Sequence, residues 1–246
     1  MILSGYNVAK SEILNGCTIS TGFAEKRRIL LKNILEFFTA KKKKRRNVLV
    51  PPEAYEPSVR VENVFRENIA SVHRKMVLEV GTLQAVPGRA THSMALFPDI
   101  ELHNYVKVDI IDGPDVDVVA DLHSLPSDWT GRFDCFIANA VFEHLERPWI
   151  AAMEVARVLA PGGIFLVKTH QCFPIHGYPS DFFRFSDSAM RLIFEDAGLV
   201  VEACGYDHRC MIIPPEQIVP DSMVFAWNKE FPSYIHVGAT GHKPSA

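Results

Sequence analysis

Polar residues that could bind a small ligand stand at the ends of four short apolar segments of the chain. They are Glu79, Asp109, Asp121 and Asn139. One carboxylate in such a place can accept hydrogen bonds from both hydroxyls of a ribose, and another can accept from the amino group of an adenine. A single carboxylate of this kind is more often a cap or turn residue. Four polar groups at four successive segment ends indicate a site for an adenosine-bearing ligand.

The glycines after the first segment indicate which adenosine-bearing ligand suits this site. Gly81 is followed by Thr82 and by no second glycine before Gly88. A dinucleotide site needs G-x-G-x-x-G, because two phosphates must meet bare backbone amides at a helix N-terminus. Asp109 also lies 28 positions after Gly81, whereas about 20 is typical of that motif. S-adenosylmethionine carries no phosphate, so the sequence favours this methyl donor over a nicotinamide cofactor.

Methyl transfer to a hydroxyl group also requires removal of a proton, for which histidine is well suited near neutral pH. We expect His176 to be the general base, because it lies in a glycine- and proline-bounded loop after the segment 164–168. His144 is the second candidate, although it could instead be a structural histidine that hydrogen-bonds the following loop. Asp181 is an orienting carboxylate or an alternative base, and it could equally pair with Arg184.

Cysteine and histidine spacing gives no sign of a metal centre. His170, Cys172 and His176 form an H-x-C-x₃-H pattern, which is not a standard ligand spacing, so we expect no metal. The five cysteines are scattered without a C-x-x-C pair. This usage is typical of reduced thiols in a cytoplasmic protein.

The elements that must position these residues begin at residue 76, where short apolar runs alternate with helical patterns. Buried parallel strands are predicted at residues 76–80, 105–110, 115–121, 134–139 and 164–168. A helix over 149–163, which ends in Pro161-Gly162-Gly163, precedes the last of these strands, and another helix spans 186–198. The run 233–239 can close the sheet. The alternation predicts a doubly wound α/β fold whose ligand lies beyond the carboxyl ends of the strands.

Four blocks of the sequence, taken in this order, resemble the class I S-adenosylmethionine-dependent methyltransferases. The blocks are VLEVG, VDIIDGPDVDVVADLHSLP, FDCFIANAVFEHLERP and EVARVLAPGGIFLV. The resemblance covers residues 76–240 and implies a Rossmann-like sheet of seven strands, mostly parallel with the last strand antiparallel. It also implies that the chain is a methyltransferase with S-adenosyl-L-methionine as its cofactor.

The same resemblance implies which residues contact the cofactor. They are Glu79, Gly81, Thr82, Asp109, Asp121, Leu122 and Asn139. Glu79 and Gly81 stand where the family holds the methionine part, and Asp109 stands where it binds the ribose. Asp121 and Leu122 match the adenine contact, and the asparagine lines the methionyl end. The loop that contains the threonine is longer and poorer in glycine than the usual GxGxG of the family.

A second resemblance concerns the segment 170–186, which contains HGYPSDFFRF. It is similar to a segment of type 11-like methyltransferases that are encoded with polysaccharide and glycoconjugate pathways, where the segment lies over the substrate side of the cofactor pocket. This implies O-methylation of a small-molecule, sugar or glycan hydroxyl. Two alternatives stay open: a catalytically silent adenosine-binding partner protein, and an N-methyltransferase of a small metabolite.

Charge divides the chain into two parts, which we expect to be a basic helical extension at 1–57 and a methyltransferase domain at 58–246. Residues 1–47 hold 11 Lys and Arg against 3 Asp and Glu, and the rest of the chain holds 15 against 26. An acidic domain argues against nucleic-acid binding on its surface. The amphipathic stretch 23–46 could contact an anionic membrane surface or pack on its own domain. No apolar run approaches the roughly 18 residues that cross a bilayer, and the start of the chain lacks a secretory signal.

Overall fold

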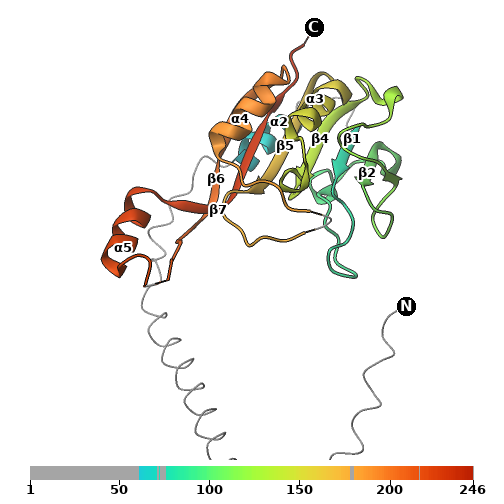
Figure 1. Ribbon diagram of the computed structural model, residues 1–246. Helices are drawn as coiled ribbons and strands as arrows, with labels where there is room; N and C mark the ends of the chain where they lie inside the picture. Colours follow the sequence, from blue (N-terminus) through green and yellow to red (C-terminus); the bar gives the residue numbers. More distant parts are fainter. Residues whose placement is uncertain (1–60, 71, 73–75, 178–179, 216, 246) are drawn as a thin grey trace, which may run out of the picture. The chain divides into compact units, whose positions relative to one another are not determined.

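A computed structural model describes residues 61–70, 72, 76–177, 180–215 and 217–245 (Figure 1). The predicted extension at 1–57 lies outside the described residues, and so does the stretch 23–46 with its proposed membrane contact. The first helix among the described residues is α2 (Val61–Ile69).

Seven strands form one mixed sheet in the order β3-β2-β1-β4-β5-β7-β6. The strands are β1 (Val77–Val80), β2 (Tyr105–Asp109), β3 (Val118–Val119), β4 (Phe133–Asn139), β5 (Leu159–His170), β6 (Val200–Cys210) and β7 (Ser233–His242). All pairs from β3 to β5 are parallel, whereas β7 is antiparallel to both β5 and β6. This arrangement confirms the predicted Rossmann-like sheet with its antiparallel last strand. The apolar runs of the sequence did not predict β6.

Alternate residues of each strand enter two separate cores on opposite faces of the sheet, because successive side chains of a strand point in opposite directions. Leu78 belongs to the core that contains residues of α3 (Pro148–Val158) and α4 (Asp187–Asp196). Val77 belongs to the core that contains Phe65 of α2. Helices α3 and α4 therefore cover one face of the sheet and α2 covers the other (Figure 1). By the same alternation, Glu79 and Asn139 point to the α2 face.

The predicted end of the helix over 149–163 is wrong. Helix α3 ends before Leu159, which already belongs to β5 and lies opposite Phe133 in the pairing with β4. The carbonyl of Gly163 accepts a hydrogen bond from the backbone N–H of Lys243 at 2.8 Å. Neighbouring segments on both sides thus pair with the backbone of this segment. The proline and the glycines therefore belong to the start of a strand and do not end a helix.

Of two other predicted elements, one is shorter than expected and one begins where the sequence predicts. The strand predicted at 115–121 is reduced to the two residues of β3, because Asp115 has a φ of 66° and leaves the extended conformation. Helix α4 begins as predicted: the Ser186 hydroxyl accepts a hydrogen bond from the Ala189 N–H at 3.2 Å, and Gly198 follows the helix with a φ of 84°.

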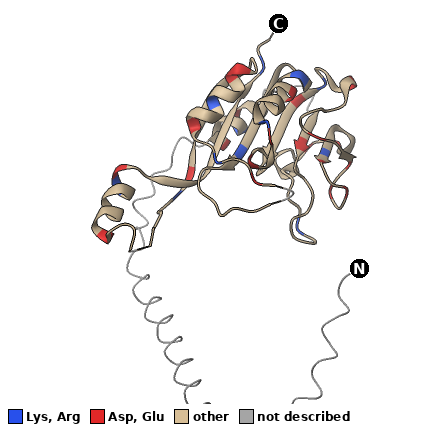
Figure 2. Cartoon of the chain, in the orientation of Figure 1, with Lys and Arg blue, Asp and Glu red and all other residues tan. Residues whose placement is uncertain are grey.

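Helix α5 (Asp221–Glu230) follows β6 and precedes β7 in the chain. In Figure 1 it lies apart from α3. Acidic and basic side chains are interspersed along the described chain (Figure 2). Each helix from α2 to α5 carries at least one carboxylate. Among the described residues, no helix is both long enough and apolar enough to cross a membrane.

Candidate functional site

The parallel strands bring the predicted cofactor residues to one edge of the sheet. Val80 lies opposite Val108 in β2 and opposite Ala138 in β4. The residues that follow these three positions, Gly81, Asp109 and Asn139, therefore stand side by side at the carboxyl ends of the strands. A ligand of a doubly wound sheet is expected at this edge.

Gly81 makes the sharp turn after β1. Its φ is 77°, and its N–H donates to the carbonyl of Val108 at 2.8 Å. A Cβ atom at this position would lie 2.3 Å from Cγ2 of Val141, so only glycine fits here. The next residue, Thr82, is buried, and its hydroxyl donates to the same carbonyl at 3.3 Å.

Glu79 is buried on the α2 face and is held by protein partners. Its carboxylate accepts hydrogen bonds from the Ser93 N–H at 2.7 Å, from the Ser93 hydroxyl at 2.8 Å and from the Tyr105 hydroxyl. Burial raises the pKa of Glu79 above its usual value, although the hydrogen bonds from Tyr105 and Ser93 oppose this shift. The structure thus gives Glu79 a role that the sequence did not show: it fixes the loop containing Ser93 over the strand edge.

Asn139 joins the same network at the end of β4. Its side-chain amide donates to the Ser93 hydroxyl at 3.1 Å and lies 3.5 Å from Oε1 of Glu79. The following Ala140 has a φ of 52°, an uncommon conformation for a residue with a Cβ atom, which turns the chain directly after the strand. Asn139 and Ser93 also line a cavity of about 240 Å³ beside α2. Its other lining residues are Glu62, Phe65, Arg66, Ala95, Leu96 and Leu166.

Asp109 retains the capacity to bind a ribose. Its Oδ2 accepts from the Leu83 N–H at 3.0 Å, and its Oδ1 accepts from the Ile111 N–H at 3.2 Å. An ionised carboxylate has about four acceptor positions, so each oxygen can take one more hydrogen bond. The side chain is only partly buried, which leaves room for two hydroxyl donors.

Asp121 lies next to Asp109 at the strand edge, because the backbone N–H of Ala120 donates to the carbonyl of Asp109 at 3.0 Å. Oδ1 of Asp121 accepts from the backbone N–H and from Nδ1 of His123 at 2.8 Å and 2.7 Å. Burial alone would raise its pKa, but these hydrogen bonds lower it below the usual value. The side chain is 51% exposed, so Oδ2 can accept from a ligand. Leu122 points into the core, so its backbone is the part that can meet a ligand.

These two carboxylates have unused acceptor capacity at neighbouring strand ends, with a glycine turn between them and the buried Glu79. This donor and acceptor set fits the ribose and the adenine of S-adenosylmethionine. The residues that would hold it are Asp109 and Asp121, with the turn at Gly81 and the amide of Asn139 towards its methionyl end.

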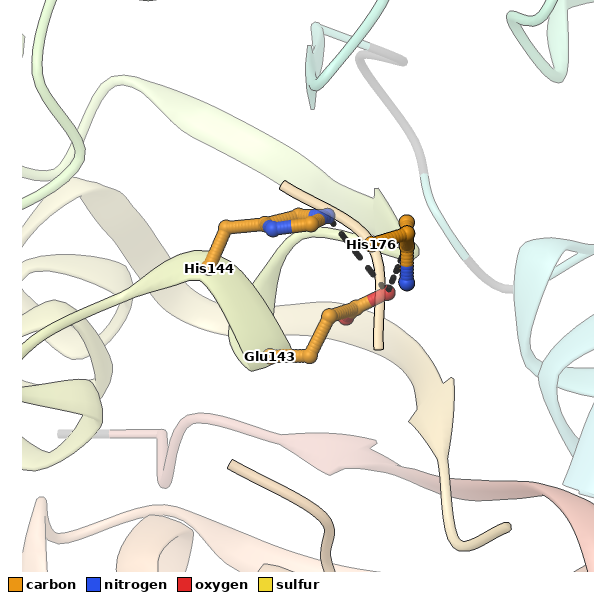
Figure 3. Close-up of side chains that lie close together, drawn as sticks. All are labelled: Glu143, His144 and His176. Carbon is orange, nitrogen blue, oxygen red and sulfur yellow. Dashed lines mark ion pairs between the residues drawn. The ribbon is translucent and has the colours of Figure 1, made fainter. Parts of the chain in front are cut away.

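A second group of side chains lies where β4 and β5 end (Figure 3). Glu143 is completely buried in the short 3₁₀ turn Phe142–His144. Its Oε1 lies 3.9 Å from Nε2 of His144 and 4.0 Å from Nε2 of His176. Its Oε2 accepts from the hydroxyl of Thr169 at 2.6 Å. The fold thus unites the two predicted base candidates around a carboxylate that the sequence analysis missed.

The other nitrogen of each imidazole is held by a backbone carbonyl. Nδ1 of His144 lies 2.6 Å from the carbonyl of Ser180, and Nδ1 of His176 lies 3.1 Å from the carbonyl of Pro174. A carbonyl oxygen can only accept, so Nδ1 carries the proton in both neutral rings and Nε2 carries a lone pair. From the sequence alone, His144 could hydrogen-bond the loop that follows it. In the structure its partner is instead the carbonyl of Ser180.

Asp181 orients His176 and is itself neutralised by Arg184. Its Oδ2 accepts from the backbone N–H of His176 at 2.8 Å and lies 3.4 Å from Nδ1 of that ring. Arg184 donates to both oxygens of Asp181, at 2.5 Å and 2.7 Å. The guanidinium holds the pKa of Asp181 far below its usual value. A carboxylate in this state does not take up a proton near neutral pH, so the geometry favours its orienting role over its role as a base.

Glu143 also contacts His170, whose Nε2 lies 3.1 Å from Oε1, although off the direction of a hydrogen bond. Burial alone would raise the pKa of Glu143, but the contacts with His170 and Thr169 outweigh it and hold the pKa below its usual value. The backbone carbonyl of Glu143 accepts from the N–H groups of Phe182 and Phe183 at 2.8 Å and 3.2 Å. These contacts lock the segment after β5 onto the turn after β4.

Comparison with known proteins agrees with this geometry. Residues 88–167 match the sequence model of a family described as methyltransferase domain. A solved structure from Bacillus halodurans C-125, assigned as a methyltransferase, is 17% identical, with 74% of this chain and 98% of that chain covered and a TM-score of 0.50. At this identity the likeness shows the fold. A SAM-dependent methyltransferase from Archaeoglobus fulgidus is 15% identical, with 74% and 93% covered and a TM-score of 0.47. Among curated proteins, no sequence matches this chain.

The sheet order, the helices on both faces and the match over residues 88–167 lead to one conclusion. The chain carries a methyltransferase domain with the Rossmann-like class I fold, and this domain implies S-adenosylmethionine as the cofactor.

Proposed function

We propose that this methyltransferase transfers the methyl group to a hydroxyl oxygen of a small molecule, a sugar or a glycoconjugate. The observation that carries the proposal is the pair of unprotonated Nε2 atoms of His144 and His176 beside the buried Glu143. A hydroxyl acceptor must lose a proton during the reaction, and these atoms can receive it. Glu143 follows Asn139 by four residues, so the acceptor end and the cofactor end of the site are close in the chain.

The chain's own residues divide the work of the reaction. S-adenosylmethionine, when bound, supplies an activated methyl group on a sulfonium. Asp109 and Asp121 position the nucleoside part, and alignment of the reacting atoms contributes up to roughly 7–11 kcal/mol to catalysis. Nε2 of His176 is the main candidate to accept the hydroxyl proton, and Nε2 of His144 is the second candidate. Asp181 keeps the His176 ring in the orientation that this transfer needs.

The type of acceptor is tested by a screen with isotopically labelled methyl donor and detection of products by mass. The screen contains sugars, nucleotide sugars and polyols beside amines of similar size. Turnover on the hydroxylated compounds alone is the expected result. Methylation of amines alone would favour the N-methyltransferase, and donor binding without turnover on any compound would favour a catalytically silent partner protein.

The proton-accepting role is tested by His176→Asn, which can keep a hydrogen bond but cannot take up the proton. We expect kcat to fall by about 10²–10⁴ with the affinity for S-adenosylmethionine unchanged, because the substitution leaves the strand-end carboxylates intact. His103→Ala is the matched control, since His103 is an exposed histidine outside the site. A variant with wild-type kcat would show that His176 is structural and would pass the role to His144.

The glycan class and the location are also part of the proposal. The HGYPSDFFRF segment supports a sugar or glycoconjugate acceptor, because it is similar to a segment of methyltransferases from such pathways and carries His176, which lies beside Asp181 and Glu143. A reducing, cytoplasmic setting suits Cys135, Cys172, Cys204 and Cys210, which are free thiols.

A further inference from the structure

Three side chains from two separate loops present ligand atoms to one point. Glu143, His144 and His176 each offer one ligand atom, and these three atoms all lie within 4.8 Å of one another (Figure 3). One carboxylate oxygen and two imidazole nitrogens are a common ligand set for divalent transition metals in proteins. The sequence predicts no metal, because the spacing of His170, Cys172 and His176 is not a standard one. The fold, however, brings together a different set of possible ligands.

The buried carboxylate of the site lacks a hydrogen-bond donor directed at one of its oxygens. Oε1 of Glu143 is completely buried and has no hydrogen-bond partner. The two nitrogens that face it carry lone pairs in the neutral rings, because both Nδ1 atoms point to backbone carbonyls. Nε2 of His170 also lies 3.1 Å from Oε1, but off the direction of a hydrogen bond. The three acceptors thus face one another without a well-directed donor between them, which is costly at a buried carboxylate. The guanidinium of Arg184 is held by both oxygens of Asp181, so its charge is already compensated.

The surroundings hold these ligands as metal ligands are usually held. A ligating histidine commonly donates its other N–H to a carbonyl or a carboxylate, which fixes the ring. The carbonyls of Ser180 and Pro174 provide this support, and Asp181 lies 3.4 Å from Nδ1 of His176. Oε2 of Glu143 is fixed by Thr169, which leaves Oε1 directed into the site. We propose that Glu143, His144 and His176 bind one divalent transition-metal cation.

The distances between the ligand atoms allow a cation to bind after a small movement of the side chains. Bonds of about 2.0–2.2 Å place two ligands of a tetrahedral ion about 3.4 Å apart. The distances from Oε1 to the two nitrogens are 3.9 Å and 4.0 Å, so each must shorten by about half an ångström. The His176 side chain is 29% exposed, so the site is open on that side for entry of the ion and for a further ligand.

Occupation of the site changes how an acceptor is deprotonated, and this part of the inference rests on the proposed function. Both Nε2 lone pairs then bind the cation and can no longer take a proton. An acceptor hydroxyl bound to the cation would become more acidic and release its proton to solvent water. His176 is the proton acceptor in the cation-free protein and a metal ligand in the loaded protein.

The binding test uses the full chain, stripped with a chelator, without methyl donor or acceptor, so that its outcome is independent of the reaction. Calorimetric titration with Mn²⁺, Co²⁺ or Zn²⁺ should give one cation per chain for at least one of these ions. With Co²⁺, the complex should show visible d–d absorption that reports nitrogen ligands. His144→Ala, His176→Ala and Glu143→Gln should each weaken binding by roughly 100-fold or more, since changes outside the ligands already cost 10–100-fold.

His103→Ala, which removes an exposed histidine elsewhere, should bind the ion as the wild-type chain does. The side chain in Glu143→Gln can still accept from Thr169, and His176 lies at the open side of the site, so Glu143→Gln and His176→Ala should keep the thermal unfolding transition of the wild type. The proposal is overturned if none of the three ions binds below about 1 mM, or if the folded ligand variants bind as tightly as the wild type.

Discussion

At the scale of the single residue, we expect cofactor affinity to depend most directly on Asp109. Replacement by alanine would remove the carboxylate that we propose accepts hydrogen bonds from both ribose hydroxyls. Charge-assisted hydrogen bonds contribute about 1.5–3 kcal/mol, so Asp109→Ala should weaken the binding of S-adenosylmethionine tenfold or more. Calorimetry of the purified variant measures this. Asp112→Ala, which removes an exposed carboxylate from the same loop, is the control. Equal affinities of the two variants would place the ribose elsewhere.

The residues of the site differ in how far the sequence could predict them. Asp109 and Asp121 end apolar runs, so their place at the strand edge follows from the pattern alone. Ser93 and Tyr105 reach Glu79 only through the loop after β1 and the register of β2. No period or spacing marks such contacts, because they depend on where side chains meet across the fold.

At the scale of the element, the contact between the turn after β1 and the segment after β4 can be tested by a pair of substitutions. Gly81→Ala would place a Cβ atom 2.3 Å from Cγ2 of Val141 and would force alanine into a φ of 77°. We expect a loss of about 1–3 kcal/mol in the free energy of unfolding, measured with urea. The double variant Gly81→Ala/Val141→Ala should recover part of this loss, because it removes the clash but keeps the strained backbone. A double variant no more stable than Gly81→Ala would show that the clash is unimportant.

The elements themselves were predictable where their patterns were strong. Strands β1, β2 and β4 and helix α4 appear within one or two residues of their predicted ranges. The segment Leu159–Gly163 was mispredicted because proline and glycine end helices in isolation, whereas here the neighbouring strands bind its backbone. Helix α5 and β6 carry no clear apolar period, so only the completed sheet shows their place.

At the scale of the whole molecule, the stability of the domain should fall in acid through Glu154 of α3. Its carboxylate accepts from Nε and Nη2 of Arg157 at 2.8 Å and 2.7 Å and from the Leu125 N–H at 2.9 Å. The hydrogen bond from Arg157 is the main cause that lowers the pKa of Glu154 below its usual value, against the opposing effect of burial. A lowered pKa in the folded state stabilises the fold above the unfolded pKa of about 4.5, and this contribution is lost as the pH falls through the folded pKa.

The measurement compares the melting temperatures of the wild type and Glu154→Gln between pH 7 and pH 3. The pair is partly exposed, so we expect a difference of about 1 kcal/mol, or about 2–4 °C, at neutral pH. This difference should shrink in acid. Glu195→Gln, which changes a more exposed pair with Arg191, should show a smaller effect. A difference for Glu154→Gln that stays constant down to pH 3 would contradict the assignment.

The sequence by itself determined the fold class, the parallel direction of the first five strands and the edge of the sheet at which the predicted cofactor residues gather. These follow from local causes: apolar alternation makes strands and helices, and parallel strands bring their carboxyl ends to one edge. Carboxylates at the ends of such strands therefore reach this edge whatever the details of packing are.

Only the tertiary structure decided the cluster of Glu143, His144 and His176. Glu143 stands beside a histidine in the sequence like any surface carboxylate, yet the fold buries it completely and brings His176 to its Oε1 from a loop 33 residues further on. The meeting depends on backbone hydrogen bonds from Phe182 and Phe183 to Glu143, which join the loops after β4 and β5. Contacts between loops are set by the packing of the whole sheet, so no local pattern of residues could have predicted them.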